Sequence, residues 1–147
     1  FDNINFGDWY AYKYDRRHDI SIVLSHKFSD KIDIGATWVY GTGNAITFPQ
    51  ATYWSYPSGP QGEYIQTLDY YGERNSTRMN PYHRFDLGVN FHKQKKHFDR
   101  TISLSIYNLY NRKNPFFVYL DEDPDQTVAR QVSLFPIIPT VTYNIRF

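Results

Sequence analysis

The stretch that decides the fold is residues 19–41, which read DISIVLSHKFSDKIDIGATWVYG. On either side of a short polar turn at residues 29–31, apolar or aromatic side chains recur at nearly every second position. This face carries Ile20, Ile22, Leu24, His26 and Phe28, and then Ile32, Ile34, Ala36, Trp38 and Tyr40. Because successive side chains of a strand point to opposite faces, a period of two predicts two antiparallel strands joined by a hairpin.

Three further runs alternate in the same way, within residues 84–92, 101–106 and 140–147. Their apolar positions are Phe85, Leu87, Val89 and Phe91, then Ile102, Leu104 and Ile106, and finally Val141, Tyr143, Ile145 and Phe147. The positions between them are mostly Ser, Thr, Gly, Asn or charged residues. Strands of roughly ten residues with one apolar and one polar face match the span of a tilted transmembrane strand. The sequence therefore predicts an all-β fold with five antiparallel strands.

The connections between these runs alternate between short and long. Short polar turns are expected at residues 29–31 and 92–96, whereas long links rich in Gly, Pro, Tyr and Asn cover about residues 41–82 and 111–130. Outer-membrane barrels have short turns on the periplasmic side and long loops on the extracellular side. This pattern predicts that the first strand runs inward from the cell surface and that the carboxyl terminus lies in the periplasm.

The composition excludes several other classes of protein. The chain has 147 residues with 16 basic and 15 acidic side chains, so no net field favours nucleic acid as a partner. It contains no cysteine, which excludes a disulfide framework and a cysteine-based metal site. The mean hydropathy is −0.62, and no apolar run approaches the ~20 residues of a membrane helix. Membrane strands that are apolar on one face only also average out as polar.

Five strands are too few to close a barrel, since the smallest class uses about eight. An open sheet in lipid would leave backbone groups unpaired, and a complete single-chain barrel has an even number of strands. We therefore expect further strands upstream of Phe1, where the sequence starts without Met or a signal peptide. A barrel made of several copies conflicts with the odd count, because simple closure would not keep every strand pair antiparallel.

The main alternative fold is a soluble antiparallel β-sandwich, which also has strands with a period of two. Small polar residues opposite the apolar faces, as in a wet lumen, favour the membrane sheet. Apolar positions also persist through Phe116, Val118 and Leu120 beyond Pro115, which indicates strands longer than ten residues. Aromatic residues cluster at strand ends, as they do at membrane interfaces, at Phe28, Trp38, Tyr40, Phe91, Tyr110 and Phe147.

Four segments resemble the late barrel of TonB-dependent outer-membrane receptors. They are YDRRHD at residues 14–19, TWVYGTGNA at 37–45, YHRFDL at 82–87 and SIYNLYNRKNP at 105–115. The alternating end of the chain is similar to the aromatic signal that barrel-assembly machinery reads, carried here by Tyr143, Ile145 and Phe147. The resemblance implies that residues 1–147 are the carboxyl-terminal part of a barrel of about twenty-two strands, of which these are the last five.

The resemblance also implies the partners and the location. The chain would lie in the bacterial outer membrane, against lipid and against the remaining strands and plug of the same receptor. Contact with the TonB complex would pass through an amino-terminal part that this chain lacks. The transported substrate is left open among an iron chelate, a peptide, a glycan and a vitamin, and a surface lipoprotein is left open as a further partner.

Two groups of residues are candidates for contact with ligand. Aromatic side chains with polar tips suit ligand capture at a barrel mouth, and they equally suit packing between loops or against a partner. In the first long link they are accompanied by one Arg, and the group is Tyr53, Trp54, Tyr56, Tyr64, Tyr70, Tyr71 and Arg74. Arg84, Asp86 and Asn90 are expected to face the lumen, where Arg84 and Asp86 could contact plug or substrate or form a lateral ion pair.

The remaining motifs point to structural roles. The charged run DRRHD at residues 15–19 is expected to form ion pairs at the barrel rim. GTGN at residues 41–44 is interpreted as a bend, because a phosphate loop opens a helix and here a strand continues. The histidines lack metal-ligand spacing, and no catalytic triad stands out. We predict no metal, no cofactor and no enzymatic activity; the alternatives are a small or multi-chain outer-membrane barrel with porin or enzyme activity, and a soluble binding module.

Overall fold

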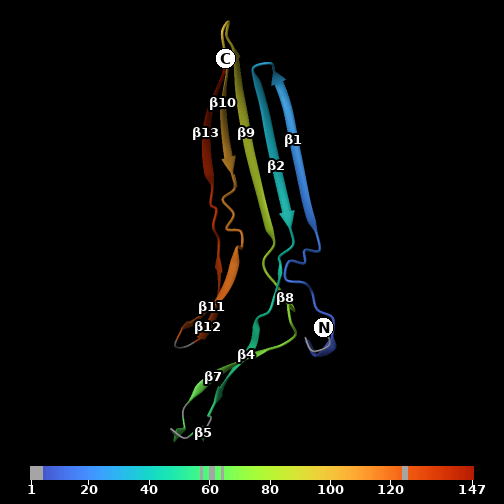
Figure 1. Ribbon diagram of the computed structural model, residues 1–147, viewed down its shortest axis with the longest axis vertical. Coiled ribbons are helices and arrows are strands. Elements are labelled where there is room, and N and C mark those ends of the chain that lie inside the picture. The colour runs from blue at the N-terminus through green and yellow to red at the C-terminus, as the bar shows by residue number, and fades with distance from the viewer. Residues whose placement is uncertain (1–4, 57, 60–61, 64, 124–125) are drawn as a thin grey trace. The chain divides into compact units, whose positions relative to one another are not determined.

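The computed structural model describes residues 5–56, 58–59, 62–63, 65–123 and 126–147. Its main feature is one antiparallel sheet of five long strands in the order β1-β2-β9-β10-β13 (Figure 1). The strands are β1 (Asp19–Ser29), β2 (Ile32–Gly41), β9 (Tyr82–Gln94), β10 (Asp99–Tyr107) and β13 (Ile138–Arg146). The prediction of an all-β fold with five antiparallel strands is confirmed. Each strand lies close to the residues where it is expected.

The strand register keeps the two kinds of side chain on opposite faces. One cross-strand row of the apolar face runs through Ile34, Val89, Leu104 and Val141. The adjacent row of the polar face contains only small side chains, at Ser25, Gly35, Gly88, Ser105 and Thr140. A slip of one residue would exchange the faces. The polar row is continuous over all five strands and the apolar row over β2, β9, β10 and β13, which explains why this register is selected.

The first short turn lies where it is expected, and the second does not. Asp30 and Lys31 connect β1 to β2, and a hydrogen bond of 2.7 Å from Lys27 Nζ to Asp30 Oδ1 lowers the pKa of Asp30. The turn expected at residues 92–96 is wrong, because β9 continues to Gln94 and the turn occupies residues 95–98. The side chains from His92 to Gln94 are all polar, so the apolar period gives no signal there while the backbone pairing continues.

The long links contain short hairpins of their own. β4 (Pro49–Ser55) pairs with β7 (Gln66–Tyr71), and β11 (Phe117–Asp123) pairs with β12 (Gln126–Val132). Val118 and Leu120 therefore belong to a separate hairpin, which the Phe116 N–H joins by donating to the Val132 carbonyl at 2.8 Å, and they do not extend β10. Smaller ladders join β3 (Ala45–Ile46) to β8 (Thr77–Arg78) and β5 (Ser58–Gly59) to β6 (Gly62–Glu63).

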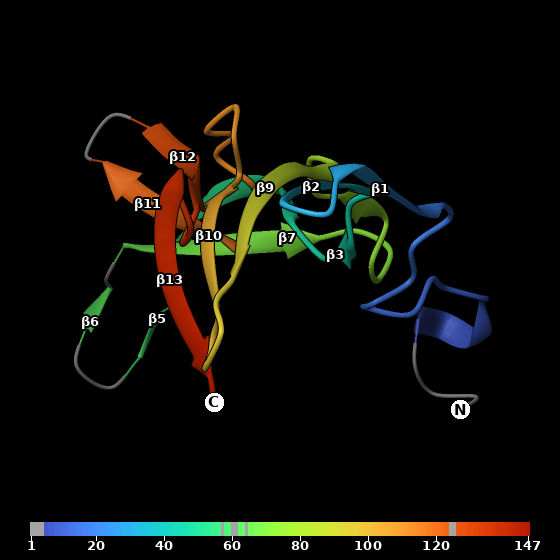
Figure 2. The same cartoon turned by 90° about the horizontal axis from the view of Figure 1, so that it is seen from above.

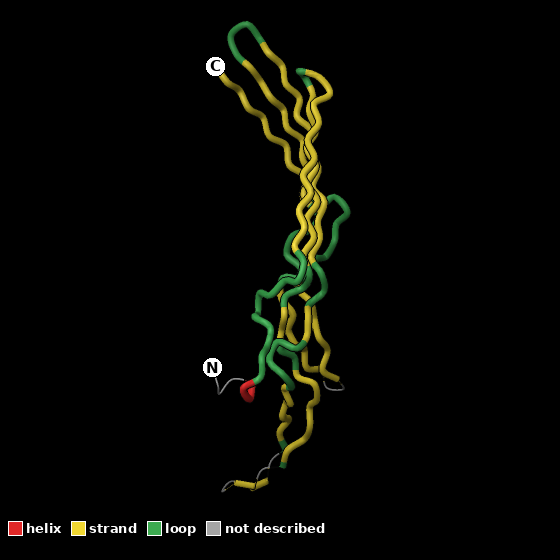
Figure 3. The backbone as a smooth tube through the Cα atoms, turned by 90° about the vertical axis from the view of Figure 1, so that its right-hand side faces the viewer, coloured by secondary structure: helices red, strands yellow, loops and turns green. Residues whose placement is uncertain are grey.

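The chain forms two compact units, one of residues 1–16 and 43–79 and the other of residues 17–42 and 80–147. The five-stranded sheet belongs to the second unit, and Figure 2 shows its strands following one another from β13 to β1. In Figure 3 the sheet is a single layer, and among the described residues of its own unit no second sheet packs against it. The sheet is open, with β1 and β13 as its edges.

The described residues contain almost no hydrophobic core. Ala45 is the one buried hydrophobic residue among them, whereas Leu24 and Val141 are 64% and 72% exposed. The one helix in the described ranges is η1 (Asn5–Gly7), a single 3₁₀ turn, so no helix there is long enough to cross a bilayer. In the described part of the chain, much of the apolar face of the sheet is therefore exposed.

Candidate functional site

The best-connected polar group on the sheet surrounds Arg84, near the start of β9. Arg84 Nε lies 2.9 Å from Asp86 Oδ2, and Arg84 Nη1 donates to the hydroxyls of Tyr82 and Tyr107 at 2.9 and 2.5 Å. The guanidinium also stacks on the Tyr107 ring, with Cζ 4.0 Å from the ring centroid. Arg84, Asp86 and Asn90 share the polar face, as expected, and the lateral ion pair is the arrangement that forms between the first two.

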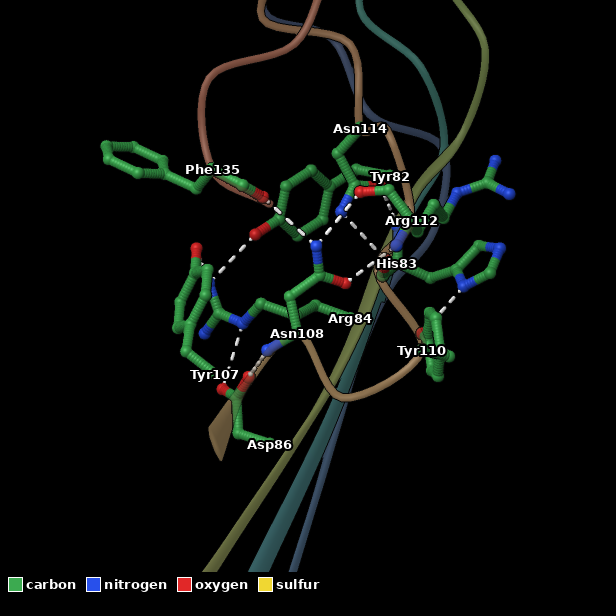
Figure 4. Close-up of polar contacts among 10 residues, drawn as sticks. All are labelled: Tyr82, His83, Arg84, Asp86, Tyr107, Asn108, Tyr110, Arg112, Asn114 and Phe135. Carbon is green, nitrogen blue, oxygen red and sulfur yellow. Dashed lines mark hydrogen bonds and ion pairs between the residues drawn. The ribbon is translucent and has the colours of Figure 1, made fainter. Parts of the chain in front are cut away.

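Asn108 connects this group to two other segments (Figure 4). Its backbone N–H donates to Asp86 Oδ1 at 2.9 Å, and its side-chain amide donates to the carbonyls of Arg112 and Phe135, both at 3.0 Å. Asn108 Oδ1 in turn accepts from the Arg112 N–H at 3.0 Å. The side chain is fully buried, and the chain leaving β10 and the chain approaching β13 are connected to β9 through this one residue.

A second asparagine continues the sheet where regular pairing ends. Asn114 Oδ1 accepts from the His83 N–H at 3.0 Å, and Asn114 Nδ2 donates to the His83 carbonyl at 2.9 Å. His83 pairs with Tyr40 of β2 on one side. On the other side, where the β9–β10 ladder has ended, the Asn114 amide takes the place of a neighbouring strand. The sequence signal for these positions was the segment SIYNLYNRKNP, but the spacing of its asparagines does not reveal their partners.

An aromatic ladder occupies the same end of the apolar face. The rings of Trp38 and Tyr40 stack with centroids 6.0 Å apart, and Tyr40 stacks on His83 at 6.5 Å. His83 contacts the Tyr110 ring at 5.5 Å, and its Nδ1 lies 2.7 Å from the Tyr110 hydroxyl. Three of the aromatic residues expected at strand ends, Trp38, Tyr40 and Tyr110, are therefore brought together here.

Toward the short turns, a polar ladder crosses β2, β9 and β10 on the opposite face. Asn90 Nδ2 donates to Asp33 Oδ2 at 2.7 Å, and His92 Nε2 pairs with Asp33 Oδ1. His92 Nδ1 lies 3.0 Å from Thr101 Oγ1. Hydrolases use the same order of hydroxyl, imidazole and carboxylate. Sequence reasoning missed this ladder because its members lie on different strands, although side-chain parity combined with the register would have placed them together.

The aromatic residues of the first long link do not form one cluster. The register pairs Tyr53 with Leu68 and Ala51 with Tyr70, so Tyr53 and Tyr70 share one face of the β4–β7 hairpin. Trp54 and Tyr71 lie on the other face by parity. Trp54 and Tyr56 are 68% and 66% exposed, as a ligand-contacting or partner-contacting surface requires. The predicted Tyr64 lies outside the described residues.

Arg74 has a role within its own unit. Its guanidinium lies 5.3 Å from the Tyr10 ring centroid, and its backbone N–H donates to Asn5 Oδ1 at 2.8 Å. Arg74 therefore contacts the amino-terminal segment. The predicted ligand site would require it to lie beside the aromatic residues of the long link instead. No hydrogen bond, ion pair or ring contact joins Arg74 to Trp54 or Tyr56 in the described structure.

The charged run at residues 15–19 finds a partner that the sequence did not suggest. Asp15 forms an ion pair with Arg78 of β8, and Arg78 Nη1 also donates to the carbonyls of Asp15 and Gly43 at 2.8 and 3.2 Å. The expected bend at residues 41–44 continues the β1–β2 ladder, with the Thr42 N–H donating to the His18 carbonyl at 3.0 Å. Both segments act as structural connections.

Of the expected assembly signal, Tyr143 and Ile145 lie on the edge strand β13, and Phe147 directly follows it. Tyr143 and Ile145 are 54% and 45% exposed, and Phe147 is 96% exposed, with its ring 6.4 Å from that of Phe98.

Within the described ranges, no group of His, Cys, Asp and Glu residues could hold a metal ion. Comparisons with known proteins found no matching family model, no similar curated protein and no similar solved structure.

Proposed function

We propose that this chain forms part of the wall and the extracellular loops of a TonB-dependent outer-membrane transporter that imports a scarce nutrient. The observation that carries the proposal is the five-stranded sheet, which has one apolar and one polar face. Within the described residues of its own unit, no helix or second sheet packs against either face. Outer-membrane barrels distribute side chains in this way, with apolar residues toward lipid and polar residues toward the lumen.

The exposure of the apolar face favours a membrane over a soluble sandwich. A sandwich would bury this face against a second sheet. Instead, Leu104 at the centre of the face is 45% exposed, and Val141 beside it on the edge strand is 72% exposed. A lipid bilayer supplies the missing cover, since it accepts apolar side chains without a second protein layer.

The two edges of the sheet support a larger barrel. β1 and β13 are each hydrogen-bonded to one neighbour only in the described sheet. Unpaired backbone groups cost on the order of several kcal/mol each in hydrocarbon, so both edges are proposed to pair with further strands of the same receptor. The plug and the contact with the energy-coupling complex belong to parts of that receptor outside this chain.

The polar face suits a lumen that holds water or a plug. Its central row of Ser, Gly and Thr leaves space, and a Cβ atom added at Gly35 would meet nothing within 4 Å. The Thr101–His92–Asp33 ladder does not favour a hydrolase, because acyl transfer also needs donors aimed at the developing oxyanion. The adjacent donor, the Asn90 amide, is bonded to Asp33. We propose that this ladder ties three strands of the wall together.

The absence of cysteine from this chain permits a direct test of its orientation. Cells express the complete receptor, with any other cysteine replaced by serine, carrying either Gln66→Cys or Lys95→Cys, and are treated with a membrane-impermeant maleimide. Both positions are exposed, in the long-loop hairpin and in the second short turn. We expect Gln66→Cys to react on intact cells and Lys95→Cys to react only after the outer membrane is permeabilised. Equal labelling on intact cells, or recovery of the protein in the soluble fraction, would refute the proposal.

A further inference from the structure

Two cations stand directly opposite each other at the short-turn end of the apolar face. The register pairs Lys93 of β9 with Arg100 of β10. By parity, Lys93 shares a face with Phe91, and Arg100 shares it with Ile102. Ile145 of β13 pairs with Arg100 and completes this row. The row therefore places two positive charges at the end of a face that is mainly apolar.

Neither cation is neutralised by the described part of the chain. Lys93 and Arg100 take part in none of its ion pairs. Asp30, in the neighbouring turn, is bound to Lys27 at 2.7 Å. Asp99 adjoins Arg100 in sequence, but it pairs with Gln94 and lies on the opposite face by parity. Like charges directly opposite each other destabilise a sheet, and an anion from outside the chain would offset this repulsion.

The surroundings of the pair identify the kind of anion. On one side lies the row of Phe91, Ile102 and Tyr143. On the other side lie Phe98 and Phe147, whose ring centroids are 6.4 Å apart. Aromatic belts mark the depth of lipid headgroups, and the long stems of Lys and Arg lie along apolar surface while their charges reach that depth.

We propose that Lys93 and Arg100 together bind the anionic headgroup of a phospholipid in the leaflet nearest the short turns. The inference rests on the proposed function, because it requires the apolar face to lie in lipid. The guanidinium can donate two parallel hydrogen bonds to the phosphodiester, and the ammonium supplies a compact second charge. The acyl chains then lie along the apolar rows that follow, through Leu104 and Val141.

Lipid retention by the purified complete receptor tests this pair. The receptor is reconstituted with equal amounts of phosphatidylglycerol and phosphatidylcholine, and the lipids that stay bound are counted by native mass spectrometry. The variant Lys93→Gln with Arg100→Gln is compared with the matched control Lys95→Gln with Arg146→Gln. The control removes one Lys and one Arg at the same end of the sheet, from the turn and from the polar face. Heat-dependent gel mobility verifies that both variants are folded.

We expect the wild type and the control to retain phosphatidylglycerol preferentially. The Lys93/Arg100 variant should lose roughly twenty-five-fold in that preference, since each cation near an anionic surface contributes about a factor of five. Equal loss in the control, or no preference in the wild type, would overturn the headgroup site while leaving the transporter proposal intact. Release of the lipid by excess inorganic phosphate would assign the pair to free phosphate and overturn it as well. A receptor that fails to reach the outer membrane would overturn both proposals.

Discussion

Asn108 shows how much of this structure can depend on one residue. Its backbone has a φ of 54°, in the left-handed region that Asn tolerates better than most residues. This conformation turns the chain out of β10 and directs the side-chain amide toward Arg112 and Phe135. The amide has both donors and an acceptor satisfied while fully buried, so any replacement leaves buried partners unpaired.

The change Asn108→Ala is therefore expected to lower the free energy of unfolding by about 2–4 kcal/mol, because it removes three hydrogen bonds and places an Ala at a positive φ. Denaturant titration of the complete receptor in detergent measures the change. Asn108→Gly should recover only the part of the lost free energy that comes from placing Ala at a positive φ. Asn144→Ala, on exposed β13, is the matched control and should change little. Equal effects at Asn108 and Asn144 would contradict the role of the buried amide.

At the scale of elements, the sequence predicts the strands whose apolar residues recur regularly, and it does not predict the elements and contacts that lack such a repeat. The five long strands follow from alternation, because a half-exposed strand needs an apolar residue at every second position. The β4–β7 hairpin lacks that regularity, because aromatic residues occur on both of its faces and its register shifts between Pro49 and Ala51. The partners of Asn108 and the Asp33–His92–Thr101 ladder depend on contacts between distant segments, which local periodicity does not encode. Parity did place Arg84, Asp86 and Asn90 on one face correctly.

The assignment of faces on β10 can be tested with two neighbouring residues. Leu104 lies in the row that joins Val89 to Val141, and Ser103 lies on the opposite face beside Asn90. If the apolar face meets lipid, Leu104→Arg should destabilise the inserted receptor by roughly 2–4 kcal/mol near the bilayer midplane. Ser103→Arg should have a much smaller effect, because its side chain enters the polar side. Folding into liposomes, followed by urea titration, measures both, and equal effects would contradict the assigned faces.

At the scale of the whole molecule, the sheet is built from contacts between residues far apart in sequence. β2 pairs with β9, and β10 pairs with β13, across both long links. Such non-local pairing forms slowly, because the loops must close before the strands gain their hydrogen bonds. Meanwhile the edge strand β13 is exposed along its whole length. An exposed apolar edge invites aggregation, so a sheet of this kind benefits from a factor that captures its last strand.

The proposed assembly signal on that strand can be separated from ordinary packing at Phe147. The side chain is 96% exposed and its one recorded ring contact is with Phe98, so Phe147→Asp should cost the folded sheet little stability. If an assembly factor pairs with β13 and holds the ring in a pocket, the same change should lower the outer-membrane level of the complete receptor severalfold. Arg146→Ala, on the opposite face of the strand, should leave that level unchanged. Quantitative blotting of purified outer membranes at matched synthesis distinguishes the two, since a stability effect alone would leave Phe147→Asp close to the wild-type level.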